Sequence, residues 1–102
     1  MFGIAPKSYK LIMYAISEFE EIEKASIYGS RAIGNFKQGS DIDIVLFGKK
    51  ITQEIVLKLK VKLEHDLPIP YFFDLTHYES ISNLELKNHI DSHGKIFYPS
   101  TT

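Results

Sequence analysis

The chain has 102 residues, which is enough for one domain around one modest core. Its formal net charge of −1 shows no bias toward nucleic acid or anionic membranes, and the absence of cysteine excludes disulfides and thiol chemistry. No apolar segment reaches the ~20 residues that span a bilayer, and residues 1–10 lack the apolar core of a signal peptide. We therefore expect a single cytoplasmic domain over residues 1–102, with no direct contact with membranes or nucleic acid.

Hydrophobic periodicity divides the chain into alternating helices and strands. Apolar residues recur at three- and four-residue spacing between Ser8 and Phe19, which predicts an amphipathic helix that starts near Pro6. A run rich in β-branched residues at Ile42–Phe47 predicts a strand. The other expected elements are a strand at Lys24–Tyr28, a short helix at Arg31–Ile33, a helix at Ile51–His65, a strand at Tyr71–Leu75, a helix from Asn83 to His93 and an edge strand at Lys95–Tyr98.

These elements predict an α+β fold. We expect a mixed, mainly antiparallel sheet of three or four strands, with helices packed on one face. Apolar residues at helical spacing in the second long helix form its buried stripe, and the lysines between them are expected on its solvated face. The expected core residues are Leu11, Ile12, Ala15, Ile16, Phe19, Ile27, Ile42, Ile44, Leu46, Ile55, Leu59, Leu63, Phe72, Leu84 and Ile90.

Two carboxylates stand at the start of the strand at 42–47. Successive side chains of a strand point to opposite faces, so Asp41 and Asp43 share one face. Two like charges inside a strand are costly unless they are paired or bound to a metal, and a divalent cation between them resolves the problem. Paired oxygen ligands beside a phosphate-binding turn are the arrangement that Mg²⁺ uses. Asp74, a lone carboxylate in another apolar strand, is either a strand-end cap or, if the two strands are neighbours, a third member of the set.

Gly29 and Ser30 interrupt the strand that precedes them. Glycine permits a tight turn and the close approach of a ligand, and Ser30 is a good N-cap for the short helix that follows. Free N–H groups and a serine hydroxyl at such a turn bind phosphate, although an ordinary capped turn uses the same residues. Ser40, directly before Asp41, either orients that carboxylate or ends the loop.

The four histidines form no motif. His89 and His93 stand four residues apart, which suits a transition metal, but no third ligand is evident and His93 lies at a helix end, where a cation is favoured. The sequence gives His65 and His77 no role. No Ser/His/Asp arrangement is supported, because Ser30 lacks the Gly-x-Ser-x-Gly context of a nucleophile elbow.

A longer motif carries a family resemblance. It reads Gly29-Ser30-Arg31-Ala32-x-Gly34, then Ser40-Asp41-x-Asp43, followed by Tyr71-Phe72-Phe73-Asp74-Leu75 and by the segment from Asn83 to Tyr98. In these segments the chain resembles the minimal nucleotidyltransferases of the DNA polymerase beta superfamily, over nearly its full length. The resemblance implies the nucleotidyltransferase fold. It also implies transfer of a nucleoside monophosphate from a nucleoside triphosphate to an acceptor, with release of pyrophosphate.

The resemblance implies a phosphate-binding role for the glycine-serine turn. Gly29 and Ser30 would hold the β- and γ-phosphates, and Arg31 and Ser40 would be further nucleotide-binding residues. Many relatives carry a basic residue where this chain has Ile33, so one charge near the triphosphate is absent.

The resemblance also implies a metal-binding and catalytic role for the three carboxylates. Asp41 and Asp43 would bind Mg²⁺, and Asp74 would bind a second Mg²⁺ or accept the acceptor's proton. Two metal ions ~3.5–4 Å apart clamp the attacking and leaving oxygens of an in-line displacement. Because such a reaction needs little covalent help from the protein, three carboxylates and a phosphate cradle suffice for it.

The short length of the chain, together with the resemblance, suggests the acceptor. Nucleotidyltransferases this small are often encoded beside a helical HEPN-domain protein and act as its antitoxin, in some pairs by attaching AMP to a tyrosine of the HEPN ribonuclease toxin. This chain lacks the HEPN ribonuclease motif, so the resemblance implies the antitoxin, with ATP as substrate and a HEPN protein as partner. Two alternatives are a module that neutralises its partner by contact alone and an enzyme that modifies a small hydroxyl compound such as an aminoglycoside. The sequence leaves the nucleotide base and a homodimer open.

Overall fold

The computed structural model describes residues 1–99. Four strands and four α-helices alternate along this part of the chain, with a π-helical turn at Lys62–Asp66 and a 3₁₀ turn at Tyr78–Ser80. Residues 100–102 of the predicted domain lie outside the described part. The elements are α1 (Pro6–Ser17), β1 (Lys24–Tyr28), α2 (Ser30–Ile33), β2 (Ile42–Phe47), α3 (Gln53–Val61), β3 (Phe73–His77), α4 (Leu84–His93) and β4 (Lys95–Tyr98).

The strands form one mixed sheet in the order β3-β2-β1-β4. β1 pairs antiparallel with both β2 and β4, whereas β2 and β3 run parallel. A parallel pair needs a long crossover, and α3 supplies it between β2 and β3. The prediction of a mixed, mainly antiparallel sheet in an α+β fold is therefore confirmed.

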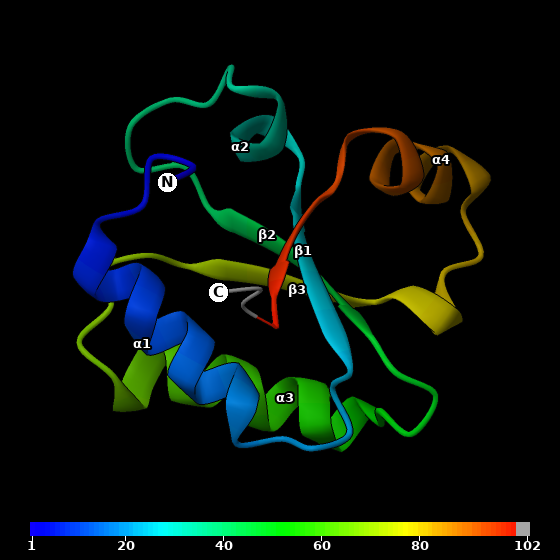
Figure 1. The fold of residues 1–102 in the computed structure, drawn as a ribbon, viewed down its shortest axis with the longest axis horizontal. Coiled ribbons are helices and arrows are strands. Elements are labelled where there is room, and N and C mark those ends of the chain that lie inside the picture. Colours follow the sequence, from blue (N-terminus) through cyan, green and yellow to red (C-terminus); the bar gives the residue numbers. More distant parts are fainter. Residues whose placement is uncertain (100–102) are drawn as a thin grey trace.

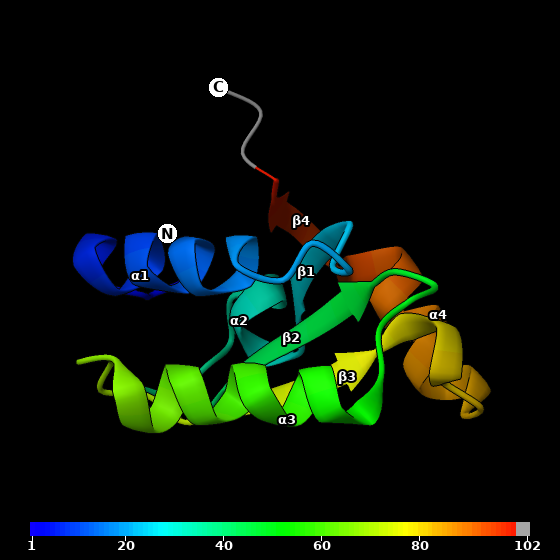
Figure 2. The ribbon, with the colours of Figure 1, turned by 90° about the horizontal axis from the view of Figure 1, so that it is seen from below.

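The two long helices cover one face of this sheet. Figures 1 and 2 show α1 and α3 side by side on that face, where the main core lies. Ile12 and Ile16 of α1 and Leu59 of α3 are fully buried there against Ile44 and the other inward residues of the strands. The predicted packing of helices on one face is confirmed for this pair.

The opposite face is only partly covered. A small second cluster lies there, in which Ile90 of α4 packs with Tyr28 and Val45 of the strands. Figure 1 shows α4 on the side of the sheet away from α1 and α3. Asn83 caps α4, since its side chain accepts a hydrogen bond of 3.0 Å from the N–H of Leu86. The rest of this face is free to carry polar groups.

Two predicted core residues are in fact exposed. Phe72 is 71% exposed and Leu84 is 73% exposed. β3 begins two residues later than predicted, at Phe73, and it is Phe73 that enters the core. Leu84 is the first residue of α4 and points away from the cluster that Ile90 joins. Both corrections concern which face of an element is buried, and neither concerns whether the element forms.

The second long helix is also shorter than predicted. Thr52 caps it, with its side chain accepting from the N–H of Ile55 at 3.2 Å, so the α-helix starts at Gln53. Beyond Val61 the helix widens into the π-helical turn that ends at Asp66. Within residues 1–99, no helix combines the length and the apolar character that crossing a membrane requires.

Candidate functional site

The three aspartates meet on the partly covered face of the sheet. Asp43 on β2 pairs in register with Asp74 on β3, and on its other side with Tyr28 on β1. Asp41 precedes β2 by one residue and shares the face of Asp43, because side chains two apart in an extended chain point the same way. The condition set by the sequence, that the strand of Asp74 neighbours that of Asp43, is met.

The electrostatics of the site centre on Asp43. Its pKa is raised above the ordinary value, first because burial penalises the charged form and then because Asp74 and Asp41 add negative charge. Arg31 and His89 act in the opposite direction. The strands thus concentrate negative charge that Arg31 only partly offsets, and a bound cation would relieve it.

The three carboxylates could supply some of the ligands of a Mg²⁺ ion, with the remaining ligands coming from water or a substrate. Carboxylate oxygens are the ligands that Mg²⁺ prefers, and the ion commonly takes one or two of them together with water and substrate phosphates. Among residues 1–99, no three His, Asp or Glu side chains come close enough to enclose a metal by themselves. Metal binding by Asp41, Asp43 and Asp74 therefore stays a prediction.

Gly29 makes the turn directly beside these carboxylates. Its backbone has φ of +72°, a conformation that side chains with a Cβ rarely adopt. A Cβ at this position would lie 2.3 Å from Oδ2 of Asp43, so glycine is needed for space as well as for conformation. Ser30 follows as the first residue of α2 and is half-buried. It does not cap the helix as predicted, because Gly29 holds the cap position and no side-chain cap bond forms.

Arg31 braces the loop that leads to Asp41. The residue is 3% exposed, and its guanidinium donates to the carbonyls of Phe2 at 2.9 Å and Ser40 at 2.7 Å, with a longer bond of 3.4 Å to that of Asp41. The rings of Phe36 and Tyr71 flank it at 4.8 and 5.2 Å. In this conformation its donors point at the protein backbone, so phosphate binding by Arg31 stays a prediction.

Ser40 closes the same loop. Its hydroxyl donates to the carbonyl of Lys37 at 2.5 Å and accepts from the N–H of Lys37 at 3.1 Å. Of the two roles that the sequence allowed, these contacts correspond to ending the loop. Nucleotide binding by Ser40 stays a prediction as well.

The comparisons with known proteins identify the family of this chain. The family model of polymerase beta nucleotidyltransferases matches residues 10–101. The chain belongs to this family. No curated protein sequence matches it.

Three solved structures share the nucleotidyltransferase fold with this chain. A toxin–antitoxin structure with AMP-PNP is 21% identical, with a TM-score of 0.70 over 85% of this chain and 69% of that one. The MntA–HepT toxin–antitoxin is 18% identical, with a TM-score of 0.67 over 90% and 70%. The complex of a tri-AMPylated HEPN toxin with an MNT antitoxin from Shewanella oneidensis is 18% identical, with a TM-score of 0.66 over 88% and 68%. At these identities the likeness establishes the fold.

His89 contacts the candidate site, and the sequence did not identify this contact. Its Nε2 accepts a hydrogen bond of 3.0 Å from the N–H of Gly29, and its ring stands edge-on to Tyr28 with centroids 6.2 Å apart. The ring of His93 lies 5.3 Å away. The four-residue spacing of the two histidines was the only signal in the sequence, and it suggested a metal pair, whereas the packing of α4 on β1 brings His89 to the turn.

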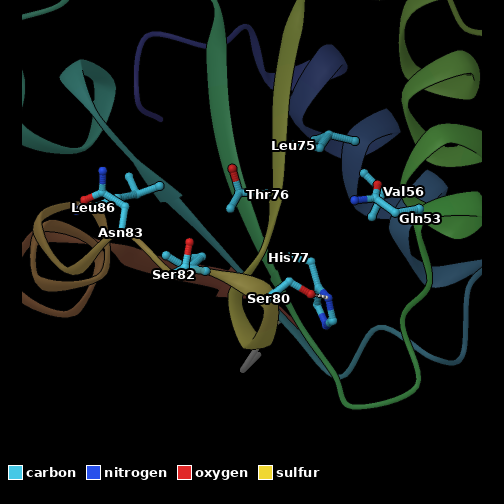
Figure 3. Close-up of a pocket in the computed structure, with 10 residues that line it drawn as sticks. Gln53, Val56, Leu75, Thr76, His77, Ser80, Ser82, Asn83 and Leu86 are labelled. Carbon is cyan, nitrogen blue, oxygen red and sulfur yellow. Dashed lines mark hydrogen bonds between the residues drawn. The ribbon is translucent and has the colours of Figure 1, made fainter.

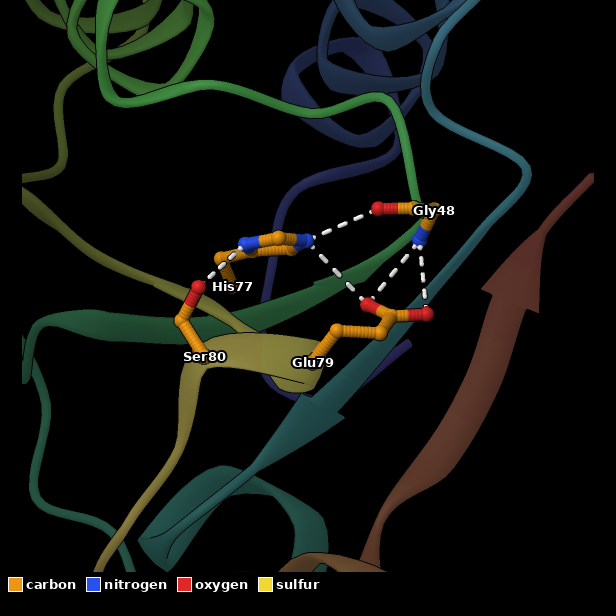
Figure 4. Close-up of polar contacts among 4 residues, drawn as sticks. All are labelled: Gly48, His77, Glu79 and Ser80. Carbon is orange, nitrogen blue, oxygen red and sulfur yellow. Dashed lines mark hydrogen bonds and ion pairs between the residues drawn. The ribbon is translucent and has the colours of Figure 1, made fainter.

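Two further features lie along β3. A pocket of about 340 Å³ runs along this edge strand between α3 and α4, lined among others by Thr76, Val56 and Leu86 (Figure 3). At the end of β3, the ring of His77 bonds Ser80 at 2.7 Å and the Gly48 carbonyl at 2.8 Å (Figure 4). Both ring nitrogens of His77 are thus hydrogen-bonded at this end of β3, where they stabilise the turn after β2. His77 does not contribute to the carboxylate site.

Proposed function

We propose that this chain is a Mg²⁺-dependent nucleotidyltransferase that transfers AMP from ATP to a tyrosine hydroxyl of a HEPN-domain protein, and that it acts in the cytoplasm as the antitoxin of that protein. The observation that carries the proposal is the register of Asp43 with Asp74, directly beside the Gly29 turn. Three carboxylates and a glycine turn on the partly covered face of the sheet form a site that a nucleotide can reach from solvent.

In this reaction each residue has a separate task. Asp41 and Asp43 would hold Mg²⁺, which would supply charge neutralisation for the triphosphate, and Asp74 would either bind a second ion or accept the acceptor's proton. Gly29 and Ser30 orient the β- and γ-phosphates. The acceptor oxygen attacks the α-phosphorus, the bond from that phosphorus to the bridging oxygen of the β-phosphate breaks, and pyrophosphate leaves. The hydroxyl proton passes to the carboxylate of Asp74, on the edge strand β3, or to solvent if Asp74 binds the second ion.

The proposed acceptor is supported by the relatives. One similar structure holds AMP-PNP, and another pairs an AMPylated HEPN toxin with its MNT antitoxin. Apolar side chains exposed near β3 suit a protein partner better than a small polar substrate: Phe72 is 71% exposed and Leu57, on α3, is 62% exposed. The same surface favours a second candidate, a module that neutralises its partner by contact without chemistry.

One labelling experiment separates the two functions. The chain is incubated with α-labelled ATP, Mg²⁺ and the HEPN-domain product of the neighbouring gene, beside the variants Asp43→Asn and Asp66→Asn. Asp66 is an exposed aspartate at the end of the π-helical turn that is not among the charges acting on Asp43, and it serves as the matched control. Label on a partner tyrosine with the wild type and Asp66→Asn, and none with Asp43→Asn, is the expected result. No label with any of the three, together with a stable complex and a neutralised toxin, would favour the contact module.

A further inference from the structure

α4 places an imidazole on the turn that is proposed to bind phosphate. Ile90 anchors this helix by packing with Tyr28 and Val45, on the same face of the sheet as the carboxylates. One residue earlier, His89 reaches over Tyr28 to Gly29, whose N–H donates to Nε2 at 3.0 Å. Since Nε2 accepts this bond it carries no proton, and the neutral ring has its proton on Nδ1.

A backbone N–H has one proton to donate, so the bond to His89 and a bond to phosphate compete. A phosphate oxygen that accepted from Gly29 would have to lie ~2.7–3.2 Å from its nitrogen and in line with the N–H bond. Nε2 of His89 already occupies that position at 3.0 Å. The imidazole and the phosphate oxygen therefore exclude each other at this donor.

We propose that His89 is a positioning residue of the nucleotide site, which holds the Gly29 N–H until a phosphate oxygen displaces it. The inference rests on the proposed function, in which Gly29 binds the triphosphate. His89 is half-buried, so its ring can turn toward the solvent side of α4 without unpacking Ile90. In the free protein the bond keeps the donor paired and the positive-φ turn at Gly29 in place. In the complex the nucleotide takes over both tasks.

Nucleotide affinity tests this competition. Binding of AMP-PNP with Mg²⁺ is measured by calorimetry for the wild type, His89→Ala, His89→Gln and His93→Ala. His89→Ala removes the competing acceptor and should bind about two- to tenfold more tightly, the range that one net hydrogen bond contributes. His89→Gln should stay near the wild type, because the glutamine side-chain oxygen can accept from the same N–H. His93→Ala, an exposed neighbour one turn further along α4, should also stay near the wild type.

A spectroscopic readout follows the bond itself. With ¹⁵N-labelled histidine and backbone, the resonances of His89 and the Gly29 amide should show the bond in the free protein and its loss on saturation with AMP-PNP and Mg²⁺. Binding that is no tighter in His89→Ala, or a His89–Gly29 bond that persists in the saturated wild type, would overturn the proposal and leave the nucleotidyltransferase intact. A failure of all four proteins to bind AMP-PNP would overturn both proposals.

Discussion

Asp43 and Asp74 lie opposite each other on the parallel strands β2 and β3. The sheet register fixes this relationship, because neighbouring strands run ~4.8 Å apart and side chains in register emerge on the same face. The two carboxylates are thus held by the backbone of the sheet, Asp43 half-buried and Asp74 exposed, and do not depend on a loop for their spacing. Repulsion between these like charges lowers the free energy of unfolding of the protein when no metal is bound.

Replacement of Asp43 by asparagine should stabilise the metal-free protein at neutral pH. Because the folded-state pKa of Asp43 is raised by burial and by Asp74 and Asp41, the folded chain holds this proton more tightly than the unfolded chain does. Stability therefore falls as pH rises from the unfolded-state pKa through the folded-state pKa, and it stays low at pH 7. The melting temperature of Asp43→Asn in the presence of a chelator should exceed that of the wild type at pH 7.

The pH dependence provides the control. In acid below both pKa values the wild-type carboxyl is protonated in both states, so the two melting temperatures should converge. Asp66→Asn, at an exposed position, should follow the wild type at every pH. An Asp43→Asn protein that melts below the wild type at pH 7 would show that the carboxylate is stabilised by its surroundings, contrary to the charge distribution described above.

Replacement of Gly29 by alanine should cost more than the same change at Gly34. Gly34 lies in the left-handed helical region, where a side chain costs roughly 1–2 kcal/mol, whereas Gly29, with φ of +72° and ψ of −153°, lies in a region that is essentially restricted to glycine. Only at Gly29 does the new Cβ meet an atom, Oδ2 of Asp43 at 2.3 Å, whereas at Gly34 nothing lies within 4 Å. Urea unfolding should show the larger loss for Gly29→Ala. Equal losses would mean that the Asp43 side chain moves aside freely.

Replacement of Arg31 by methionine should destabilise the fold by about 2–4 kcal/mol, because the carbonyls of Phe2 and Ser40 lose their donors in a buried site. Lysine at this position should be intermediate, since it cannot reproduce the planar fork of the guanidinium. The exposed Lys37 in the same loop offers the comparison, and Lys37→Met should leave the urea midpoint unchanged. If Arg31→Met kept wild-type stability but lost nucleotide binding, the phosphate role expected from the family resemblance would be supported.

Truncation to alanine should destabilise the protein strongly at Phe73 and hardly at all at its neighbour Phe72. Phe73 is 2% exposed and part of the main core, so Phe73→Ala should cost about 3–5 kcal/mol. Phe72 is 71% exposed, and Phe72→Ala should change stability by less than ~0.5 kcal/mol. Chemical denaturation of the two variants checks the strand register directly, and the reverse order of stabilities would show that β3 is shifted by one residue.

The alternation within β3 explains why the sequence predicted this strand but assigned one of its faces wrongly. Phe72 and Asp74 are two residues apart and share a face, so Phe72 cannot be in the core while Asp74 stands beside Asp43 on the other side of the sheet. Three consecutive aromatics at Tyr71–Phe73 obscured the alternation. Asp74 itself carried the information, since a carboxylate marks the uncovered face.

Other parts of the site depended on contacts that a local pattern does not contain. The strands, the glycine turn and the order of the helices follow from periodicity and turn chemistry, and they were predicted. The burial of Arg31 depends on Phe2 and Tyr71, which are distant in sequence and meet it only after folding. The bond from Gly29 to His89 joins residues 60 apart. Arg31 and Gly29 were identified from the sequence, but the distant residues that contact them could not be predicted from it.

Asp74 lies on β3, and β3 is the outermost strand of the sheet on its side. Within residues 1–99 no further strand flanks it, and the pocket along this edge is open to solvent. Under the proposed function the two substrates need different access: the nucleotide binds beside the Gly29 turn, whereas a protein acceptor approaches from the unpaired edge of β3.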